Sequence, residues 1–402
     1  ITMPQQISIF DLAQNRQNPT GGGHIIGKSI IQFNHTYDDI ISLENLLEAW
    51  KEFRKDKRSR KDVQEFERDL MSNIMSLHSD LDAKTYRHSS YEAFKVNDPK
   101  PRDIHKATVR DRLLHRALYR KLYPFFNRIF ISDSTSCRLE KGTHKAVNRF
   151  RVFARKASFN HTKTVWVLKC DIRKFFASID QTRLLAILAR YILDKDILSL
   201  ISIIIGSFHS TEKGIGLPLG NLTSQLFVNI YMNEFDQFMK HRIKAKYYIR
   251  YSDDFVIISR DRDWLVSIIS RIRNFLWYEL KLQLHPNKVS IGTITSGIDY
   301  LGWVNFNDHR VLRTSTKRRM FKRIQLKQGK RETVQSYLGM IGHGNCRKVE
   351  MEVRWSIDDL PKSLIFSILL SNEKSPQIRA HPRHYQARWN PEDIGWRDYK
   401  EI

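Results

Sequence analysis

Two adjacent carboxylates, Asp253 and Asp254, interrupt an otherwise apolar part of the chain. The segments on either side, residues 247–250 and 255–258, consist largely of aromatic and β-branched residues. Such runs, separated by a short polar step, predict a β-hairpin with the two carboxylates at its tip. Aspartates at turns most often serve only the turn geometry, so the pair alone does not establish a chemical role.

A third carboxylate, Asp171, directly follows the β-prone run from Val165 to Cys170, and we therefore expect it at the end of a strand. Beside the hairpin it would bring three carboxylates to one point. There each raises the pKa of the others unless a cation intervenes. Carboxylate oxygens suit Mg²⁺. Two such ions about 3.5–4 Å apart can stabilise the attacking and leaving oxygens of a displacement at phosphorus.

The sequence around these aspartates resembles the reverse transcriptase family. YYIRYSDDFVII is similar to the YxDD box of that family, and LKCDIRKFFASID is similar to the block that carries its first metal-binding aspartate. The family's motifs continue in the same order over residues 91–303. This resemblance implies an RNA-directed DNA polymerase with Asp171, Asp253 and Asp254 as catalytic residues. It also implies two Mg²⁺ ions, replaceable by Mn²⁺, held by these aspartates and Ile172.

The resemblance further implies a site for the incoming deoxynucleoside triphosphate. Phe176 matches the aromatic position that stacks under the sugar and excludes a ribose 2′-hydroxyl, although a core phenylalanine would give the same pattern. The segment FKVNDPKPRDI is similar to the fingers block whose cations hold the triphosphate, a task that suits the planar donor fork of arginine. Lys288 matches the lysine that protonates or neutralises departing pyrophosphate. The expected nucleotide-binding residues are Lys100, Arg102, Phe176, Leu219, Gly220 and Lys288.

Template RNA and an RNA/DNA duplex are the expected macromolecular ligands. GIDYLGW resembles the block that supports the primer strand, and the basic segment after it resembles a thumb that grips a duplex backbone. Phosphate contacts of that kind would make the affinity steeply salt-dependent. The expected primer and template contacts are Gln225, Tyr251, Tyr300, Leu301 and Gly302.

One motif departs from most of the family. Where PQG is usual, the chain reads GLPLGNLTSQ, with Leu219 at the glutamine position and Gln225 where proline is common. This variant resembles the reverse transcriptases of diversity-generating retroelements, bacterial or phage-encoded enzymes that copy a template RNA with errors at adenines and imply a small basic accessory protein. An amide can hydrogen-bond near the nascent base pair, whereas leucine offers only shape, so selection would weaken. The alternative is that Leu219 only packs and fidelity is set elsewhere.

Two rival assignments stay open. The chain could serve a retron, a group II intron or a phage-defence system, because these use the same polymerase core. His343 and Cys346 form only one pair of zinc-ligand residues, which argues against a zinc-stabilised endonuclease. From another class, the chain could be a non-catalytic RNA-binding protein that kept a polymerase fold. The presence of all three aspartates disfavours that reading.

The bulk composition agrees with a nucleic-acid partner. Lys and Arg number 68 against 43 Asp and Glu, a formal charge of +25, and charge of this size attracts polyanions. The densest apolar run, residues 197–205, is far shorter than the roughly 20 residues of a membrane-spanning helix. The three isolated cysteines, Cys137, Cys170 and Cys346, suit neither a disulfide framework nor a zinc site. We therefore expect an intracellular, cytoplasmic protein that does not bind membranes.

The expected fold is α/β (α+β), a right-hand polymerase whose palm is an antiparallel sheet with helices and whose thumb is helical. Leu43, Leu46, Leu47 and Trp50 have the spacing of one amphipathic helix, and residues 63–77 predict a second. Short strands and helices are expected over residues 91–156, and a glycine-rich loop before a long helix over residues 221–240. The expected regions are an N-terminal arm and helical extension (1–85), fingers (86–160), palm (161–305), and thumb with C-terminal tail (306–402).

Overall fold

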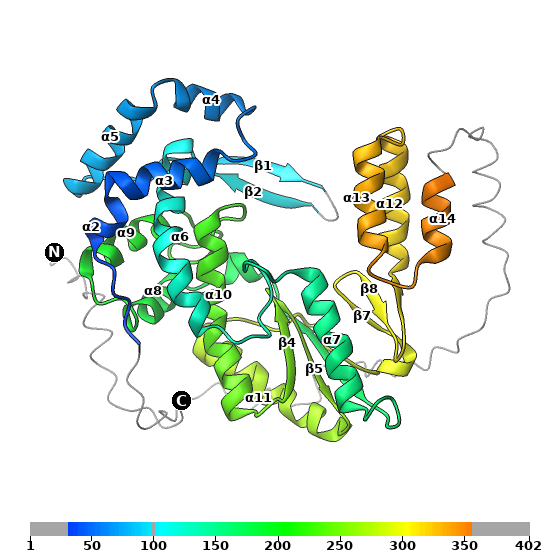
Figure 1. The fold of residues 1–402 in the computed structure, drawn as a ribbon. Helices are drawn as coiled ribbons and strands as arrows, with labels where there is room; N and C mark the ends of the chain where they lie inside the picture. The colour runs from blue at the N-terminus through cyan, green and yellow to red at the C-terminus, as the bar shows by residue number, and fades with distance from the viewer. Residues whose placement is uncertain (1–30, 98–100, 356–402) are drawn as a thin grey trace. The chain divides into compact units, whose positions relative to one another are not determined.

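The computed structural model describes residues 31–97 and 101–355, and Figure 1 shows the course of the chain. The chain divides into two compact units, residues 1–301 and residues 302–402. Residues 1–30, where the predicted N-terminal arm begins, lie outside the described residues, as do the predicted nucleotide ligand Lys100 and the tail beyond residue 355.

Unit 1 is built around a four-stranded antiparallel sheet. Its strands are β3 (Trp166–Asp171), β4 (Tyr247–Tyr251), β5 (Asp254–Ser259) and β6 (Ser290–Thr293). They lie in the order β4-β5-β3-β6, and every neighbouring pair is antiparallel. The predicted strand that ends at Asp171 and the predicted hairpin around the two carboxylates are both confirmed.

Alternation along these strands separates two faces of the sheet, because successive side chains point to opposite sides. On one face Phe255 packs against Phe235 of α10 (Leu222–Gln237), with ring centroids 5.0 Å apart. On the other face Tyr247 packs against Phe153 of α7 (Thr143–Ala157), at 5.2 Å. The helix α11 (Arg262–Leu280) packs against β3 and β5. Both faces are thus covered, and the sheet can hold its strand ends rigidly.

Further elements of unit 1 follow or flank the strands of this sheet. They are the α-helices α8 (Gln181–Ala189) and α9 (Lys195–Gly206), the short helices η1 (Phe175–Ser178), η2 (Phe238–Arg242) and η3 (Ile294–Ser296), and strand β7 (Ile298–Tyr300). The π-helical turn η2 directly continues α10, as the prediction of one long helix requires. Asp180, Asp194 and Asp261 cap α8, α9 and α11 through their side chains, each satisfying otherwise unpaired backbone donors.

The N-terminal part of unit 1 is helical. It consists of α2 (Tyr37–Ile41), α3 (Leu43–Arg54), α4 (Lys61–Arg68) and α5 (Leu70–Asp82), the hairpin β1 (Glu92–Val96) with β2 (Arg102–Lys106), and α6 (Val109–Ile129). The predicted second helix is interrupted at Asp69, where φ −116° and ψ 41° are not helical. The short strands and helices predicted over residues 91–156 are present as β1, β2, α6 and α7, but α6 is longer than predicted. The helix α6 has 21 residues, because Thr108 caps it and α3 and α10 bury its apolar side chains.

Unit 2 begins with a small hairpin of β8 (Trp303–Asn305) and β9 (Arg310–Leu312). Three helices follow, α12 (Thr314–Leu326), α13 (Arg331–Ile341) and α14 (Arg347–Trp355). Its buried apolar side chains include Met320, Ile324, Val334, Ile341 and Val353 of the helices and Trp303 and Leu312 of the hairpin. A helical segment after Trp303 is therefore confirmed.

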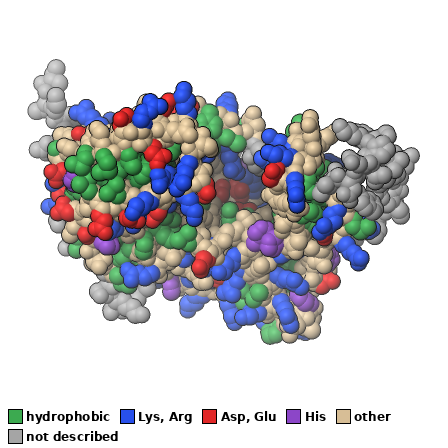
Figure 2. Space-filling view, turned by 45° about the horizontal axis from the view of Figure 1, so that its top comes forward, with side chains coloured by type: hydrophobic (Ala, Val, Ile, Leu, Met, Phe, Trp, Pro, Cys, Tyr) green, Lys and Arg blue, Asp and Glu red, His purple; other side chains and the backbone are tan. Residues whose placement is uncertain are grey.

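Mixed helices and antiparallel sheets confirm the predicted α+β class. Figure 2 shows Lys and Arg side chains spread widely over one face of the molecule. None of the helices in the described parts of the chain is long and apolar enough to cross a bilayer.

Candidate active site

The candidate site lies at the β4–β5 turn. Ser252 and Asp253 connect the two strands, and Ser252 has φ +57°, a left-handed conformation that costs a non-glycine residue roughly 1–2 kcal/mol. The strand register places Asp171 of β3 directly opposite Asp254 of β5. The Ile172 N–H donates to the Asp253 carbonyl at 3.2 Å, which ties the turn to the end of β3. Backbone pairing thus assembles three aspartates from two distant segments.

Lys288 reaches the same strand end. Its Nζ donates to Asp171 Oδ1 at 2.9 Å, and the His285 N–H donates to the Asp171 carbonyl at 2.8 Å. The lysine side chain is 41% exposed, whereas that of Asp171 is 18% exposed. Lys288, predicted to act on departing pyrophosphate, is therefore held beside the first predicted metal ligand.

The carboxylates at the turn are electrostatically uncompensated. Burial is the main cause that raises the pKa of Asp254 to about 7; Asp171, Asp253 and Asp299 raise it further and Lys169 opposes them. Burial, followed by repulsion from Asp171, also raises the pKa of Asp253, while Lys288 and Arg102 lower it. Lys169, Lys288 and Arg102 thus do not bring the pKa of either turn carboxylate down to its ordinary value.

The donor set fits a divalent metal ion in its chemistry. Asp254 Oδ1 is buried and has no hydrogen-bond partner, and a carboxylate oxygen in that state suits a hard cation. The predicted convergence is only partial, however. In residues 31–97 and 101–355, no three His, Cys, Asp or Glu side chains are grouped closely enough to hold a metal ion. Asp171 pairs with Lys288 instead, since like charges repel.

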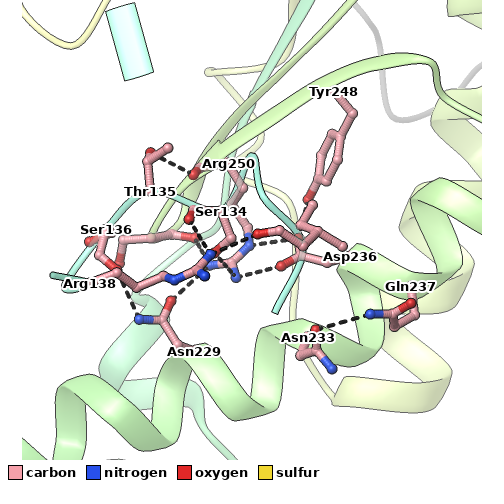
Figure 3. A network of polar contacts seen from close by, with 12 residues as sticks. Ser134, Thr135, Ser136, Arg138, Asn229, Asn233, Asp236, Gln237, Tyr248 and Arg250 are labelled. Carbon is pink, nitrogen blue, oxygen red and sulfur yellow. Dashed lines mark hydrogen bonds and ion pairs between the residues drawn. The ribbon is translucent and has the colours of Figure 1, made fainter. Parts of the chain in front are cut away.

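A buried ion pair supports the turn from the opposite face of the hairpin (Figure 3). Arg250 and Asp236 are both fully buried and form a bidentate pair, Nε to Oδ1 at 2.8 Å and Nη2 to Oδ2 at 2.7 Å. Tyr248 donates a further hydrogen bond to Asp236 at 2.7 Å. Arg250 Nη1 donates to the Ser252 carbonyl at 3.0 Å, and Nη2 donates to Ser134 Oγ at 2.9 Å. The guanidinium therefore holds the strained turn in place.

Three of the residues predicted to bind the nucleotide, Phe176, Leu219 and Gly220, lie in or directly beside the glycine-rich loop. The Leu217 N–H donates to the Phe176 carbonyl at 2.8 Å, and the His105 N–H of β2 donates to the Leu219 carbonyl at 3.0 Å. Gly220 has φ +104°, and a Cβ there would lie 2.8 Å from Ile104. Phe176 and Leu219 are half-buried. The predicted fingers cation Arg102 is exposed on β2 and lies close enough to lower the pKa of Asp253.

The predicted primer and template residues are more scattered. Gln225 is half-buried in the first turn of α10, and Tyr251 is half-buried beside the turn, where its hydroxyl accepts from Thr143 at 3.4 Å. Tyr300 is fully buried, with its ring 5.7 Å from that of Phe150, so it cannot touch a primer directly in this conformation. Leu301 is the last residue of unit 1 and Gly302 the first of unit 2, and both have positive φ, +50° and +87°.

Sequence reasoning missed the support network. Arg250 stands within the largely aromatic and aliphatic strand YYIRY, whereas Asp236 stands in the mixed helix segment NEFDQF, between Phe235 and Phe238. A charged residue in an apolar run is costly to bury unless it is paired, so Arg250 signals a buried partner. The identity of that partner depends on tertiary packing over 14 residues of sequence.

The amino-acid sequence of the chain matches a known protein family. The family model described as Reverse transcriptase (RNA-dependent DNA polymerase) matches residues 95–304, just over half of the chain. That segment contains β3, β4 and β5 with all three aspartates.

Individual relatives are distant. Protein YkfC of Escherichia coli (strain K12) is 25% identical over 248 residues, which cover 52% of this chain and 62% of YkfC. The group II intron-encoded protein LtrA of Lactococcus lactis subsp. cremoris is 23% identical over 300 residues, 57% of this chain and 47% of LtrA. The chain thus spans less than two thirds of these curated relatives. A solved partial Cas6-RT-Cas1–Cas2 complex aligns at 19% identity and a TM-score of 0.38, covering 61% of this chain and 43% of that chain.

Proposed function

We propose that this chain, which belongs to the reverse transcriptase (RNA-dependent DNA polymerase) family, extends a primer into DNA along an RNA template at the β4–β5 turn. One observation carries the proposal. Asp171 lies opposite Asp254 in the strand register, with Asp253 in the adjoining turn, and all three belong to the segment that the family model matches.

The aspartates and the Ile172 carbonyl would hold divalent cations, Mg²⁺ or, in its place, Mn²⁺. When bound, such ions neutralise phosphoryl oxygens and lower the pKa of the attacking hydroxyl. The chain itself positions the reactants. Arg102 and Lys288 present cations to a triphosphate, and Phe176 and Leu219 border the sugar. In-line positioning of primer end and α-phosphorus makes the reaction effectively unimolecular.

The proposal also assigns polymerase roles to the regions of the chain. Residues 86–160 would act as fingers, residues 161–305 as palm, and residues 306–402 as thumb and tail. Ligands would be template RNA, the RNA/DNA duplex and dNTPs, and a small basic accessory protein would assist.

The finer proposal is an error-prone enzyme of a diversity-generating retroelement. Its support is Leu219 at the usual glutamine position, in a loop whose backbone is bonded on both sides, to Phe176 and to His105. A fixed backbone lets a side-chain change act on the nascent base pair alone. With leucine there, no amide can hydrogen-bond near the pair.

Primer extension on a defined RNA template, followed by sequencing of the cDNA, tests both polymerase activity and fidelity. It is carried out with wild type, Leu219→Gln and Leu219→Met. The methionine variant is the matched control, because it keeps an apolar side chain of similar volume. We expect abundant errors at template adenines in wild type and Leu219→Met, and several-fold fewer in Leu219→Gln. Equal fidelity in all three would refute the role of Leu219 and leave the polymerase proposal standing.

An intron-type role is the second candidate, since one relative is a group II intron-encoded protein. Accurate cDNA from the wild type would favour that role, or a retron or defence role. RNA binding without any cDNA would indicate a non-catalytic protein that kept the fold.

A further inference from the structure

A basic pocket lies at the end of α7, outside the candidate active site. Its volume is about 690 Å³. The pocket is lined by Asp133, Arg149, Phe153, Arg155, Lys156, Phe159, Asn160, Lys240, Lys246 and Tyr247. All of these residues belong to unit 1.

The lining carries a large excess of positive charge. Five cations face one carboxylate, Asp133, which is shared between Arg149 Nε at 2.7 Å and Lys240 Nζ at 3.9 Å. Lys156 and Lys246 are exposed. Burial lowers the pKa of Lys240, which shows that placing this cation here is costly. Concentrated positive charge in a concave surface is suited to phosphate groups.

Aromatic rings stand among these cations. Tyr247 is half-buried, with Lys246 Nζ 5.5 Å from its ring centroid. Phe159 is 55% exposed, although a large apolar side chain is usually buried. Arg260 lies over its ring at 4.5 Å.

The backbone of the loop that contains Phe159 is strained at three consecutive residues. Phe159, Asn160 and His161 have consecutive φ values of +50°, +56° and +70°. Left-handed conformations of non-glycine residues persist where the surroundings enforce them, and they cluster at functional sites. Here Ser158 Oγ accepts from the His161 N–H at 2.9 Å, and the Arg155 carbonyl accepts from the Asn160 N–H at 2.9 Å. The loop thus holds an exposed ring at the pocket edge.

This pocket is separate from the aspartates. Tyr247 begins β4 and Tyr251 ends it beside the turn. At about 3.4 Å per residue, the strand places the two roughly 13 Å apart. A ligand in the pocket therefore does not occupy the polymerisation site.

We propose that this pocket binds a single-stranded nucleic acid segment outside the copying site, with its phosphates on Lys156, Lys240 and Lys246 and a base on Phe159. Exposed rings favour a single strand, because a duplex hides the faces of its bases. The segment is either template RNA beyond the copied stretch or released cDNA, and the two share the required phosphates and bases.

Fluorescence anisotropy with labelled oligo(U) RNA and oligo(dT) DNA of about 10 nucleotides tests the proposal. An excess of blunt, unlabelled primer–template hybrid occupies the polymerase channel. Lys246→Glu and Lys156→Glu reverse charges in the pocket. Phe159→Asn removes the ring and suits the left-handed backbone. Lys244→Glu is the matched control, because Lys244 is exposed in the same loop as Lys246 and does not line the pocket.

Each lysine variant is expected to weaken binding roughly 3- to 10-fold and to reduce the slope of log affinity against log salt by about 0.7 per lost phosphate contact. Phe159→Asn should weaken binding by roughly 5- to 100-fold, as the loss of one stacked base implies. Lys244→Glu should bind like wild type, and all variants should melt like wild type by circular dichroism. Stronger loss for RNA or for DNA identifies the natural source.

Equal affinity in the pocket variants and Lys244→Glu would overturn the proposal. So would binding of inorganic phosphate, anionic vesicles or an acidic peptide at this pocket without measurable binding of either oligonucleotide. Because the blunt hybrid occupies the channel separately, failure here leaves the polymerase proposal intact.

Discussion

The two faces of the β4–β5 hairpin differ in whether their buried charges are paired. On the face that packs against α10, Arg250 is fully buried, and its guanidinium donates hydrogen bonds to Asp236, to Ser134 and to the Ser252 carbonyl. On the other face, Asp254 is left with an unpartnered oxygen and a pKa raised to about 7, mainly by burial. Paired buried charge specifies structure, whereas charge left uncompensated marks a place where an external ligand completes the site. The hairpin thus joins a structural support to a functional edge.

The largest expected effect is on catalysis at the uncompensated face. Asp253→Asn should reduce cDNA synthesis by at least about 1,000-fold, because the loss of one negative ligand removes transition-state charge stabilisation. RNA affinity should stay within about twofold of wild type. Single-nucleotide incorporation and RNA binding, measured on the same preparation, check this. Parallel loss of both would assign Asp253 a structural role.

Breaking the buried Arg250–Asp236 pair should instead destabilise the protein. Asp236→Asn leaves Arg250 buried without its counter-ion, which should cost about 3–5 kcal/mol of unfolding free energy. Urea denaturation monitored by circular dichroism measures this.

The double variant Asp236→Leu with Arg250→Met is the control for that experiment. It removes both charges and should recover part of the lost stability. If Asp236→Asn were as stable as wild type, the contrast between the two faces would be lost.

The charge at Asp254 should make stability depend on pH. Its folded pKa of about 7 lies above the ordinary aspartate value of 3.8, so its contribution to folding stability is fully present below about pH 4 and is lost as the pH rises through 7. In a chelating buffer, Asp254→Asn should therefore be more stable than wild type at pH 8, by on the order of 4 kcal/mol, and should lose this advantage near pH 4. Thermal melts across this range check the trend, and a constant difference would contradict it.

The smallest expected change in stability concerns Lys288. Its ion pair with Asp171 is partly exposed, so Lys288→Met should alter the unfolding free energy by less than about 1 kcal/mol. Nucleotide incorporation should fall roughly 10-fold, because the departing pyrophosphate loses its cation. Lys281→Met, an exposed lysine at the end of α11, is the control and should alter neither quantity.

Local pattern predicted much of this molecule. The strand before Asp171 and the carboxylate hairpin follow from β-prone runs and a two-residue turn, and a long helix was correctly predicted after the glycine-rich loop that ends at Gly220. What sequence alone did not give depends on tertiary contacts. The break at Asp69 and the length of α6 arise from packing between helices distant in sequence.

In the candidate site, too, some features were predictable from local sequence and others depend on tertiary contacts. Family motifs located the three aspartates, but not the pairing of Lys288 with Asp171 or the buried position of Tyr300. Arg250 was visible as a lone charge in an apolar strand, whereas Asp236 has polar neighbours in sequence and gave no such signal. Their pairing across the hairpin and α10 is a property of the fold.

Metal-dependent primer extension tests the central claim most directly. Wild type and Asp171→Asn are supplied with an RNA template, a DNA primer and dNTPs, in Mg²⁺, in Mn²⁺ or in a chelator. The account predicts cDNA from wild type with either metal, none in chelator, and none from Asp171→Asn. Wild type that makes no cDNA on any RNA template, or Asp171→Asn that extends as fast as wild type, would contradict it.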